Sequence, residues 1–332
     1  MNMENEVIFV TGANGMLGTN ICLELVRQKY EVKALCLNEC ESKFLSQNGI
    51  NVIEGNILDK QKLTENIKGC DKVIHIAALT GIWPRRCEKI KEVNVRGTMN
   101  IVAAAKENNI KRIVHIGSAS SFQGGCKNFP GNEASPFLGK KYKMDYIDTK
   151  YEAQEYLMEE YRKNQLPVLI INPTFMIGAF DSGPSSGKML ISLYKNQLPG
   201  YSSGGKNFVC STDVAKAVVN ALTLGRTGEC YIAGSTNLTY AEFFKIACKV
   251  MNKPFKMKKI PHFAILAVGF INSISGRITG KAPKLSYGVA RMSNIEQYYH
   301  CEKAVSELQM TQTPIEVGIR SSIEWFLQNK YC

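Results

Sequence analysis

A glycine-rich segment near the start of the chain constrains the fold most strongly. Residues 11–18 read TGANGMLG, which places Gly12, Gly15 and Gly18 three residues apart. The β-branched run Val7–Val10 stands directly before this segment, and helical spacing of apolar residues follows it. Between a strand and a helix, such glycines allow a tight turn, close approach of a phosphate and close packing of helix on strand. The segment therefore predicts a dinucleotide-binding fold, in which a pyrophosphate would lie at the N-terminus of the first helix.

The first half of the chain alternates short β-branched runs with helical patterns, which is typical of a parallel sheet with crossover helices. We expect strands at Val7–Val10, Glu31–Cys36, Val52–Glu54, Lys72–Ile76, Arg112–Ile116 and Val168–Ile171. We expect helices at Gly15–Tyr30, Lys60–Ile67, Lys89–Asn108 and Tyr146–Lys163. These elements predict an α/β fold with a doubly wound parallel sheet of the Rossmann type, and ligands at the carboxyl ends of its strands.

The alternation weakens after Pro173, where glycine and proline mark loops. We therefore expect a dinucleotide-binding domain at residues 1–173. Residues 174–332 should form a smaller, mainly substrate-binding region, with returns to the first sheet allowed. Binding clefts favour the junction of two such parts.

Composition limits the class of protein. A chain of 332 residues with 45% apolar and 21% charged residues can bury a sizeable core. It opens MNMENEVIFVTG, without a basic leader or an apolar h-region, which predicts a cytoplasmic protein. Eleven cysteines without a C-x-x-C pair and only four histidines predict reduced, packed cysteines and no metal site.

The net charge of +12 would attract nucleic acid, anionic lipid or an anionic cofactor, and does not choose among them. The basic runs at 140–143 and 253–259 are short and lack alternating aromatics, so we expect solvated surface and no nucleic-acid partner. The most apolar stretch, Phe263 to Ile271, is far below the ~20 residues of a spanning helix, which predicts no membrane span. A surface that rests on a membrane is the less favoured interpretation of this stretch.

Tyr146 and Lys150 place a phenol and an ammonium four residues apart, on one face of an expected helix. A neighbouring cation stabilises phenolate and brings the phenol pKa toward the operating range. This spacing alone recurs by chance in lysine-rich helices. Ser118 favours the catalytic interpretation, because it follows the expected strand Arg112–Ile116 and can hold a substrate carbonyl beside the phenol.

Jointly, these motifs resemble the extended short-chain dehydrogenase/reductases, which include nucleotide-sugar epimerases and dehydratases, dihydroflavonol reductases and 3β-hydroxysteroid dehydrogenases. The resemblance covers nearly the whole chain. It rests on TGANGMLG, EGNILD at 54–59, DKVIHIAA at 71–78, NVRGT at 94–98, Gly117-Ser118, YIDTK at 146–150 and NPTFMIG at 172–178. It implies an NAD(P)-dependent enzyme whose catalytic residues are Tyr146, Lys150 and Ser118.

The resemblance also implies which residues bind the cofactor. Asn56 and Ile57 would border the adenine. Pro173 and Thr174 would lie near the nicotinamide, and Asn94 would support the active site. The full expected set is Gly12, Asn14, Gly15, Met16, Leu17, Gly18, Leu37, Asn56, Ile57, Ala77, Ala78, Asn94, Tyr146, Lys150, Pro173 and Thr174.

The end of the second expected strand bears on the choice between NAD(H) and NADP(H). An acid there favours NAD, and a basic residue nearby favours NADP. This chain has Cys36-Leu37-Asn38, and Glu39 and Glu41 come late. Without the acid, nothing there repels a 2′-phosphate, and the basic surface favours the more anionic cofactor. We therefore expect a slight preference for NADP(H).

The serine segment departs from the family pattern. From Ser118 to Gly124 it is one residue longer than the usual spacing between the serine and a glycine. Ser120 or Ser121 is therefore an alternative for the working hydroxyl, although counting from the strand favours Ser118.

Two features favour a reductase over a sugar-nucleotide enzyme. By resemblance, the sugar-nucleotide members of the family have an arginine that binds the substrate diphosphate, and this chain has Lys206 at that position. Lysine lacks the planar guanidinium group with which arginine makes two parallel hydrogen bonds to phosphate. Residues 300–304, HCEKA, resemble the dihydroflavonol reductase and steroid-dehydrogenase branch of the family. A dehydratase would also need an acidic residue just after the catalytic serine to move further protons, and Ala119-Ser120 provides none. We expect reduction of an aldehyde or ketone, or oxidation of the matching alcohol. The alternatives are a nucleotide-sugar epimerase or dehydratase with recycled NAD(P), and a non-catalytic dinucleotide-sensing regulator.

The segment from Phe122 to Asp145 is long for a structureless link, and we expect it to fold over the active site. Nearby apolar residues favour an apolar, aromatic or steroid-like small-molecule substrate. The candidate substrate contacts are Ser120, Phe122, Gln123, Phe175 and Met176. The sequence leaves the oligomeric state open, with a homodimer allowed.

Overall fold

A computed structural model describes residues 6–38 and 42–332. In these residues, the main sheet has the strand order β3-β2-β1-β4-β5-β6-β9, and every pairing is parallel. Its strands are β1 (Val7–Thr11), β2 (Glu31–Cys36), β3 (Asn51–Glu54), β4 (Lys72–His75), β5 (Arg112–Ile116), β6 (Val168–Pro173) and β9 (Cys230–Ala233). The order reverses between β1 and β4, which is the point where doubly wound sheets bind ligands.

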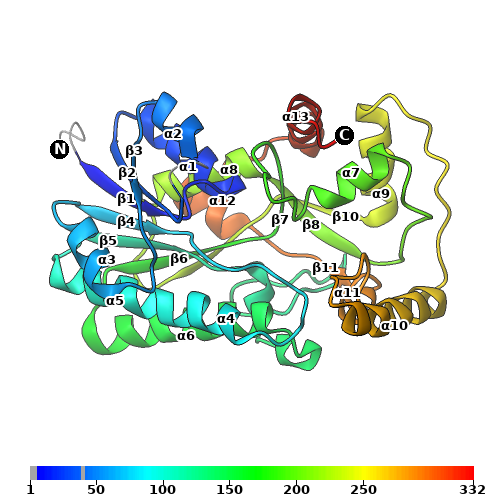
Figure 1. Ribbon diagram of the computed structural model, residues 1–332, viewed down its shortest axis with the longest axis horizontal. Coiled ribbons are helices and arrows are strands. Elements are labelled where there is room, and N and C mark those ends of the chain that lie inside the picture. Colours follow the sequence, from blue (N-terminus) through cyan, green and yellow to red (C-terminus); the bar gives the residue numbers. More distant parts are fainter. Residues whose placement is uncertain (1–5, 39–41) are drawn as a thin grey trace.

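Helices cover both faces of this sheet (Figure 1). One face carries α1 (Met16–Arg27), α2 (Lys43–Gln47), α8 (Ser211–Asn220) and α12 (Glu302–Leu308). The other carries α3 (Lys60–Ile67), α4 (Glu88–Lys91), α5 (Gly97–Glu107) and α6 (Asp145–Asn164). The α/β doubly wound fold expected from the sequence is therefore confirmed.

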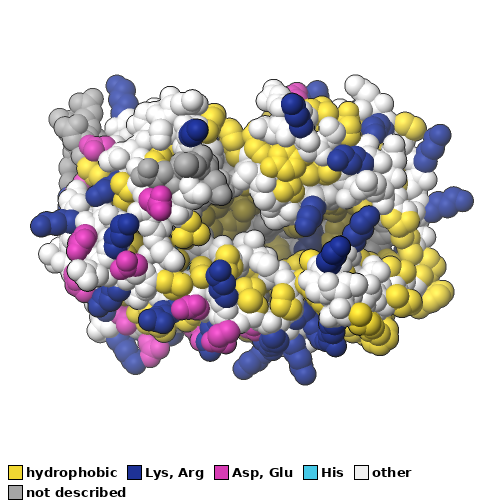
Figure 2. Space-filling model, in the orientation of Figure 1, with side chains coloured by type: hydrophobic (Ala, Val, Ile, Leu, Met, Phe, Trp, Pro, Cys, Tyr) yellow, Lys and Arg dark blue, Asp and Glu magenta, His cyan; other side chains and the backbone are white. Residues whose placement is uncertain are grey.

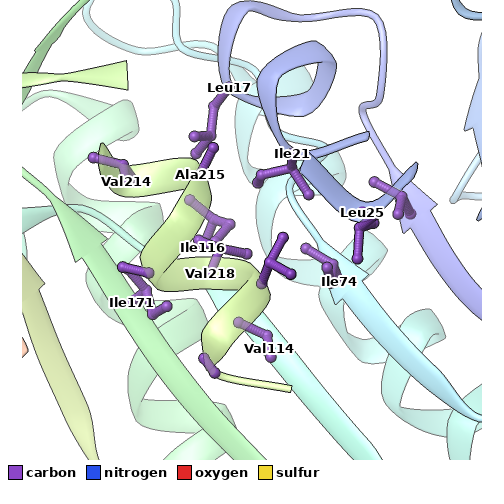
Figure 3. Packing of buried hydrophobic residues seen from close by; sticks show 14 of the residues in the cluster. Leu17, Ile21, Leu25, Ile74, Val114, Ile116, Ile171, Val214, Ala215 and Val218 are labelled. Atoms are coloured by element: carbon purple, nitrogen blue, oxygen red, sulfur yellow. The ribbon is translucent and has the colours of Figure 1, made fainter. Parts of the chain in front are cut away.

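Apolar residues at helical spacing fix the first helical layer. Leu17, Ile21 and Leu25 recur every four residues of α1 and point toward α8 and the sheet (Figure 3). The other labelled members of this core come from α8 and from strands β4, β5 and β6: Ile74, Val114, Ile116, Ile171, Val214, Ala215 and Val218. This packing holds α1, and with it the glycine-rich turn, against the sheet.

A smaller sheet follows, with the order β10-β8-β11 and β7 paired to β8. Its strands are β7 (Phe175–Ile177), β8 (Gly205–Cys210), β10 (Thr236–Thr239) and β11 (Glu296–Gln297). The helices α7 (Lys188–Tyr194), α9 (Tyr240–Val250) and α13 (Ile315–Gln328) share its core, and α10 (His262–Thr279) packs on α11 (Tyr287–Met292). No helix in the described part of the chain is long and apolar enough to cross a membrane.

Two elements differ from the sequence expectation. The expected helix Lys89–Asn108 is divided into α4, a π-helical turn at Glu92–Arg96, and α5. The seventh strand of the main sheet, β9, comes from the second half of the chain, and its short run CYIA had not been assigned to a strand. Such π-helical turns are frequent at functional sites because they turn side chains out of the regular helical register.

Candidate active site

The glycine-rich turn is tightly packed at two of its glycines and open at the third. Gly12 has φ +67°, and a Cβ on it would lie 2.8 Å from the backbone nitrogen of Ala77. A Cβ on Gly18 would lie 2.2 Å from the carbonyl oxygen of Gly12. Gly15 differs, because a Cβ there would meet only that oxygen, at 3.6 Å. Gly15 is also the N-cap of α1 and makes no side-chain cap, so the first amides of the helix remain available to an anion.

Thr11 ties this turn to the end of β4. Its Oγ1 lies 2.8 Å from His75 Nδ1 and accepts hydrogen bonds of 3.2 Å from the backbone nitrogens of Ile76 and Ala77. The segment that starts with Ala77 and Ala78 therefore leaves the sheet beside Gly12, at the switch point of the strand order.

The structure brings Tyr146, Ser118 and Ser120 together. Ser118 follows β5, and its side chain lies near the Tyr146 phenol in the first turn of α6, where it lowers the pKa of that phenol. The Oγ atoms of Ser118 and Ser120 lie 2.8 Å apart, which extends the chain of hydroxyls. Ser121 is buried instead, and its hydroxyl has no hydrogen-bond partner among the described residues. Of the three serines considered from the sequence, Ser118 is the one whose side chain lowers the pKa of the phenol.

Lys150 lies one turn after Tyr146 and is buried. Its Nζ donates a 2.7 Å hydrogen bond to the carbonyl oxygen of Ile116, at the end of β5. Burial lowers the pKa of Lys150 to about 8, because an ammonium loses hydration there. At neutral pH the side chain is therefore still mainly charged, although the protein holds that charge less readily than water does.

Asn94 positions α6 from the π-helical turn. Its Nδ2 donates to Thr149 Oγ1 at 3.0 Å, next to Lys150. The same side chain accepts from the backbone nitrogen of Leu79 at 2.7 Å and donates to the Leu79 carbonyl oxygen at 3.1 Å. Asn94 thus links α6 to the segment that leaves β4.

Burial sets the protonation states around this pair. It raises the pKa of Tyr146 above its ordinary value, and the neighbouring Ser118 side chain acts in the opposite direction. It also lowers the pKa of His75 to about 3, and that of His115 well below its usual range, with Lys150 adding to both effects. At neutral pH the phenol is protonated, and the two imidazoles add no positive charge beside Lys150.

A small cavity of about 30 Å³ lies next to the serines. Three of the five candidate substrate contacts, Ser120, Phe122 and Gln123, line it. Other lining residues come from α6, from β11 and its neighbours, and from the segment 122–145: Gly124, Leu138, Gly139, Tyr142, Ile147, Met292, Ile295, Glu296, Gln297 and Tyr299. The long segment thus folds over the serine end of the site, where single bridges join Gly125 to Tyr298 and Gly131 to Tyr299.

The other two expected substrate contacts lie on β7, outside the lining of this cavity. The Phe175 ring packs edge-on against Phe208 with centroids 5.5 Å apart, and Met176 packs against the core under α1 and α8. Lys206 Nζ lies 5.2 Å from the centre of the Phe175 ring and donates a 2.8 Å hydrogen bond to Gln297 Oε1. Desolvation lowers the pKa of Lys206 to about 8.

The remaining expected cofactor contacts lie where strands of the main sheet end. Leu37 follows β2 and is 70% exposed, and Ile57 follows β3 with its side chain packed against Gly97. Asn56 lies in the same turn, and Pro173 ends β6. Figure 2 shows a hollow between the two halves of the molecule, at the edge toward which these strands point.

Thr174 follows Pro173 and is held by Asn207, whose Oδ1 accepts a 2.8 Å hydrogen bond from the threonine hydroxyl. Glu39 and Glu41, considered from the sequence as late acids after β2, lie outside the described residues.

Sequence reasoning missed Tyr299, which fixes the serine segment. Its hydroxyl donates to the carbonyl oxygens of Ala119 and Phe122, at 3.0 and 3.3 Å. The tyrosine lies about half the chain away from that segment, so no local pattern points to the contact. Asn172 adds a second support, because its Oδ1 accepts from the backbone nitrogen of Ser118 at 2.8 Å.

The sheet order, the glycine-rich turn and the Tyr–Lys–Ser cluster define the class as the extended short-chain dehydrogenase/reductases. Comparison with known proteins agrees. Residues 8–234 match the NAD dependent epimerase/dehydratase family. The chain belongs to this family and is an NAD(P)-dependent oxidoreductase.

Individual relatives cover almost the whole chain. A Synechocystis sp. protein provisionally named dihydroflavonol 4-reductase is 27% identical, over 98% of this chain and 96% of the relative. Sterol demethylase protein B of Methylococcus capsulatus is 24% identical, over 96% and 97% of the two chains. The crystal structure of gox2253 is similar with a TM-score of 0.85 and 25% identity, over 98% of this chain and 99% of that one.

Proposed function

We propose that this oxidoreductase reduces the carbonyl group of an apolar small molecule, or oxidises the matching alcohol. The observation that carries the proposal is the position of the Ser118 side chain beside the Tyr146 phenol, one turn from buried Lys150. A carbonyl oxygen between the two hydroxyls would accept a hydrogen bond from each. When bound, a nicotinamide cofactor supplies or takes up the hydride.

The residues fit such a cofactor. The open side of Gly15 would take a pyrophosphate against the N-terminus of α1, and Gly12 and Gly18 keep that turn tight. On this proposal Leu37, Asn56 and Ile57 surround the adenosine. The remaining contacts of the expected set, toward the nicotinamide end, are Ala77, Ala78, Asn94, Tyr146, Lys150, Pro173 and Thr174.

Each member of the cluster has a distinct task in the reduction. Tyr146 donates its phenolic proton to the carbonyl oxygen as hydride reaches the carbon. Lys150 stabilises the phenolate that remains and would hold the ribose of a bound nicotinamide cofactor. Ser118 gives the same oxygen a second hydrogen bond, which stabilises the charge that develops there.

The surroundings of Lys206 favour a reductase over a sugar-nucleotide enzyme. Its ammonium is a single point charge that already bonds Gln297 and lies over Phe175, and it offers no planar fork to a diphosphate. The name of the Synechocystis relative also supports a reductase. An epimerase or dehydratase, which shares the hydride step, is the alternative that the next experiment separates.

We predict that the reaction consumes cofactor in proportion to product. The purified chain, given a panel of aldehydes, ketones, hydroxysteroids and UDP- or dTDP-sugars, should change the nicotinamide absorbance by one equivalent per carbonyl reduced. An epimerase returns its cofactor to the starting state. Turnover of a nucleotide sugar with no net change in that absorbance would move the protein to the alternative class.

We also predict tighter binding of NADP(H) than of NAD(H), because no acid stands at positions 36 to 38 to repel a 2′-phosphate. Leu37→Asp should weaken NADPH binding about fivefold, since two like charges ~4 Å apart in water repel by about 1 kcal/mol. Leu37→Asn, of equal size and no charge, should change it little. Calorimetry with both cofactors tests this, and tighter NADH binding by the wild type would contradict it.

A further inference from the structure

Helix α10 carries an apolar stripe on the side that faces away from the protein. The stripe consists of Phe263, Phe270, Ile271, Ile274 and Ile278, spaced by seven, one, three and four residues, which is one face of an α-helix. Phe263 is 75% exposed, Ile271 63% and Ile278 80%. A surface helix of a globular protein ordinarily turns such a stripe toward the core, so α10 is inverted in this respect.

Close packing on the opposite side fixes this orientation. A Cβ on Gly269 would lie 2.7 Å from the Cβ of Ala290 in α11. A Cβ on Gly276 would lie 2.9 Å from the carbonyl oxygen of Lys281, and 3.1 Å from the Trp83 ring. The inner side of α10 therefore has no room for the large residues of the stripe. If the helix rotated to bury the stripe, the close contacts at Gly269 and Gly276 would be lost. These contacts therefore keep the apolar stripe exposed.

The region around the stripe is strongly basic. Residues 243–295 contain ten Lys and Arg and no Asp or Glu. Nine of these cations are exposed. Two of them lie on α9, and the other seven lie before, within and after α10: Lys256, Lys258, Lys259, Arg277, Lys281, Lys284 and Arg291. On the face in Figure 2, Asp and Glu gather at the sheet end of the molecule, and the opposite end shows Lys and Arg with hydrophobic side chains over α10.

We propose that α10 is a docking surface for an anionic phospholipid bilayer. The stripe would lie at the boundary between headgroups and acyl chains, and the surrounding cations would contact lipid phosphates. An exposed apolar helix face with a basic border is the chemistry of helices that lie in the membrane interface. The helix lies on the bilayer and does not cross it.

Charge favours a bilayer over a second copy of the chain as the occupant. Two copies paired through α10 would bring two basic surfaces together, and like charges there repel. An anionic lipid surface neutralises the same cations. The inference stands independently of the proposed reaction, because membrane binding is measured without substrate or cofactor.

Vesicle flotation of the full chain tests the inference. The wild type should float with vesicles of equal parts phosphatidylcholine and phosphatidylglycerol, less in high salt, and less with phosphatidylcholine alone. The triple variant Phe263→Ser/Ile271→Ser/Ile278→Ser should lose about tenfold or more in partitioning. The matched control is Val317→Ser/Leu327→Ser, which changes two exposed apolar residues of α13. It should float like the wild type.

Thermal unfolding with and without NADPH checks that each variant folds and binds cofactor. Flotation of the triple variant equal to that of the control would overturn the inference. A wild type that does not float with the anionic vesicles would overturn it as well. Sedimentation velocity measures the oligomeric state and so tests whether a second copy of the chain occupies the stripe. A wild-type dimer that the triple variant dissociates, without flotation of the wild type, would assign the stripe to a second copy and overturn the bilayer.

Discussion

The Tyr146→Phe variant is expected to lose about 10²–10⁴-fold in kcat, which is the typical contribution of a positioned general acid. The change removes one hydroxyl and leaves the ring in place. Because burial keeps the pKa of Tyr146 above its ordinary value, the wild-type phenol is protonated at neutral pH and ready to donate. Cofactor affinity should barely change. Steady-state kinetics together with NAD(P)H titration measure both quantities.

Three further variants show whether the effect belongs to this hydroxyl. Tyr151→Phe removes a phenol from the same helix, where its ring stacks on Phe137, and should keep wild-type kcat. Ser118→Ala should slow turnover less than Tyr146→Phe. Lys150→Met should weaken both turnover and cofactor binding, since it removes a charge with two tasks. A Tyr146→Phe enzyme with wild-type kcat on its true substrate would contradict the proposed mechanism.

The Gly15→Val variant is expected to raise the Kd for NAD(P)H by about 5- to 150-fold, since overpacking by a side chain typically costs ~1–3 kcal/mol. The backbone of Gly15 is extended, at φ −81°, and a Cβ there meets only one atom, at 3.6 Å. The variant should therefore fold normally and fail only where phosphate must bind. Cofactor titration and thermal unfolding without cofactor separate these two effects.

Two other glycines serve as controls for that experiment. Gly183→Val adds the same side chain where nothing lies within 4 Å, and should leave the Kd unchanged. Gly18→Ala should lower the unfolding temperature instead, because its Cβ would lie 2.2 Å from the Gly12 carbonyl oxygen. An unchanged Kd in Gly15→Val would mean that the phosphate binds elsewhere.

Local sequence signals were sufficient for the framework of the fold. Six strands of the main sheet were expected from β-branched runs, and the structure has each of them within a few residues. The glycine-rich turn could be located for the same reason, since strand, turn and helix follow one another in the chain. Ser118 and Tyr146 meet because one follows β5 and the other begins α6, which both lie at the carboxyl edge of the sheet.

Contacts between distant segments could not be predicted in this way. Tyr299 reaches the serine segment from the far end of the chain, and β9 joins the sheet after an excursion through β7 and β8. The π-helical turn that presents Asn94 has no periodicity to mark it. In α10, the spacing of apolar residues predicts a stripe, but it does not predict whether the stripe faces the core or the solvent. The close contacts of the α10 glycines with α11 and its neighbours decide this.

The most direct test of carbonyl reduction follows the hydride itself. NADPH carrying deuterium at C4 of the nicotinamide, in each of its two stereochemical forms, is incubated with the wild type and a carbonyl substrate found in the panel. Mass spectrometry of the product then locates the label. The account predicts that one form transfers one deuterium to the former carbonyl carbon for each NADPH oxidised. Product without deuterium from either form, or a nucleotide sugar isomerised while the cofactor returns to its starting state, would contradict it.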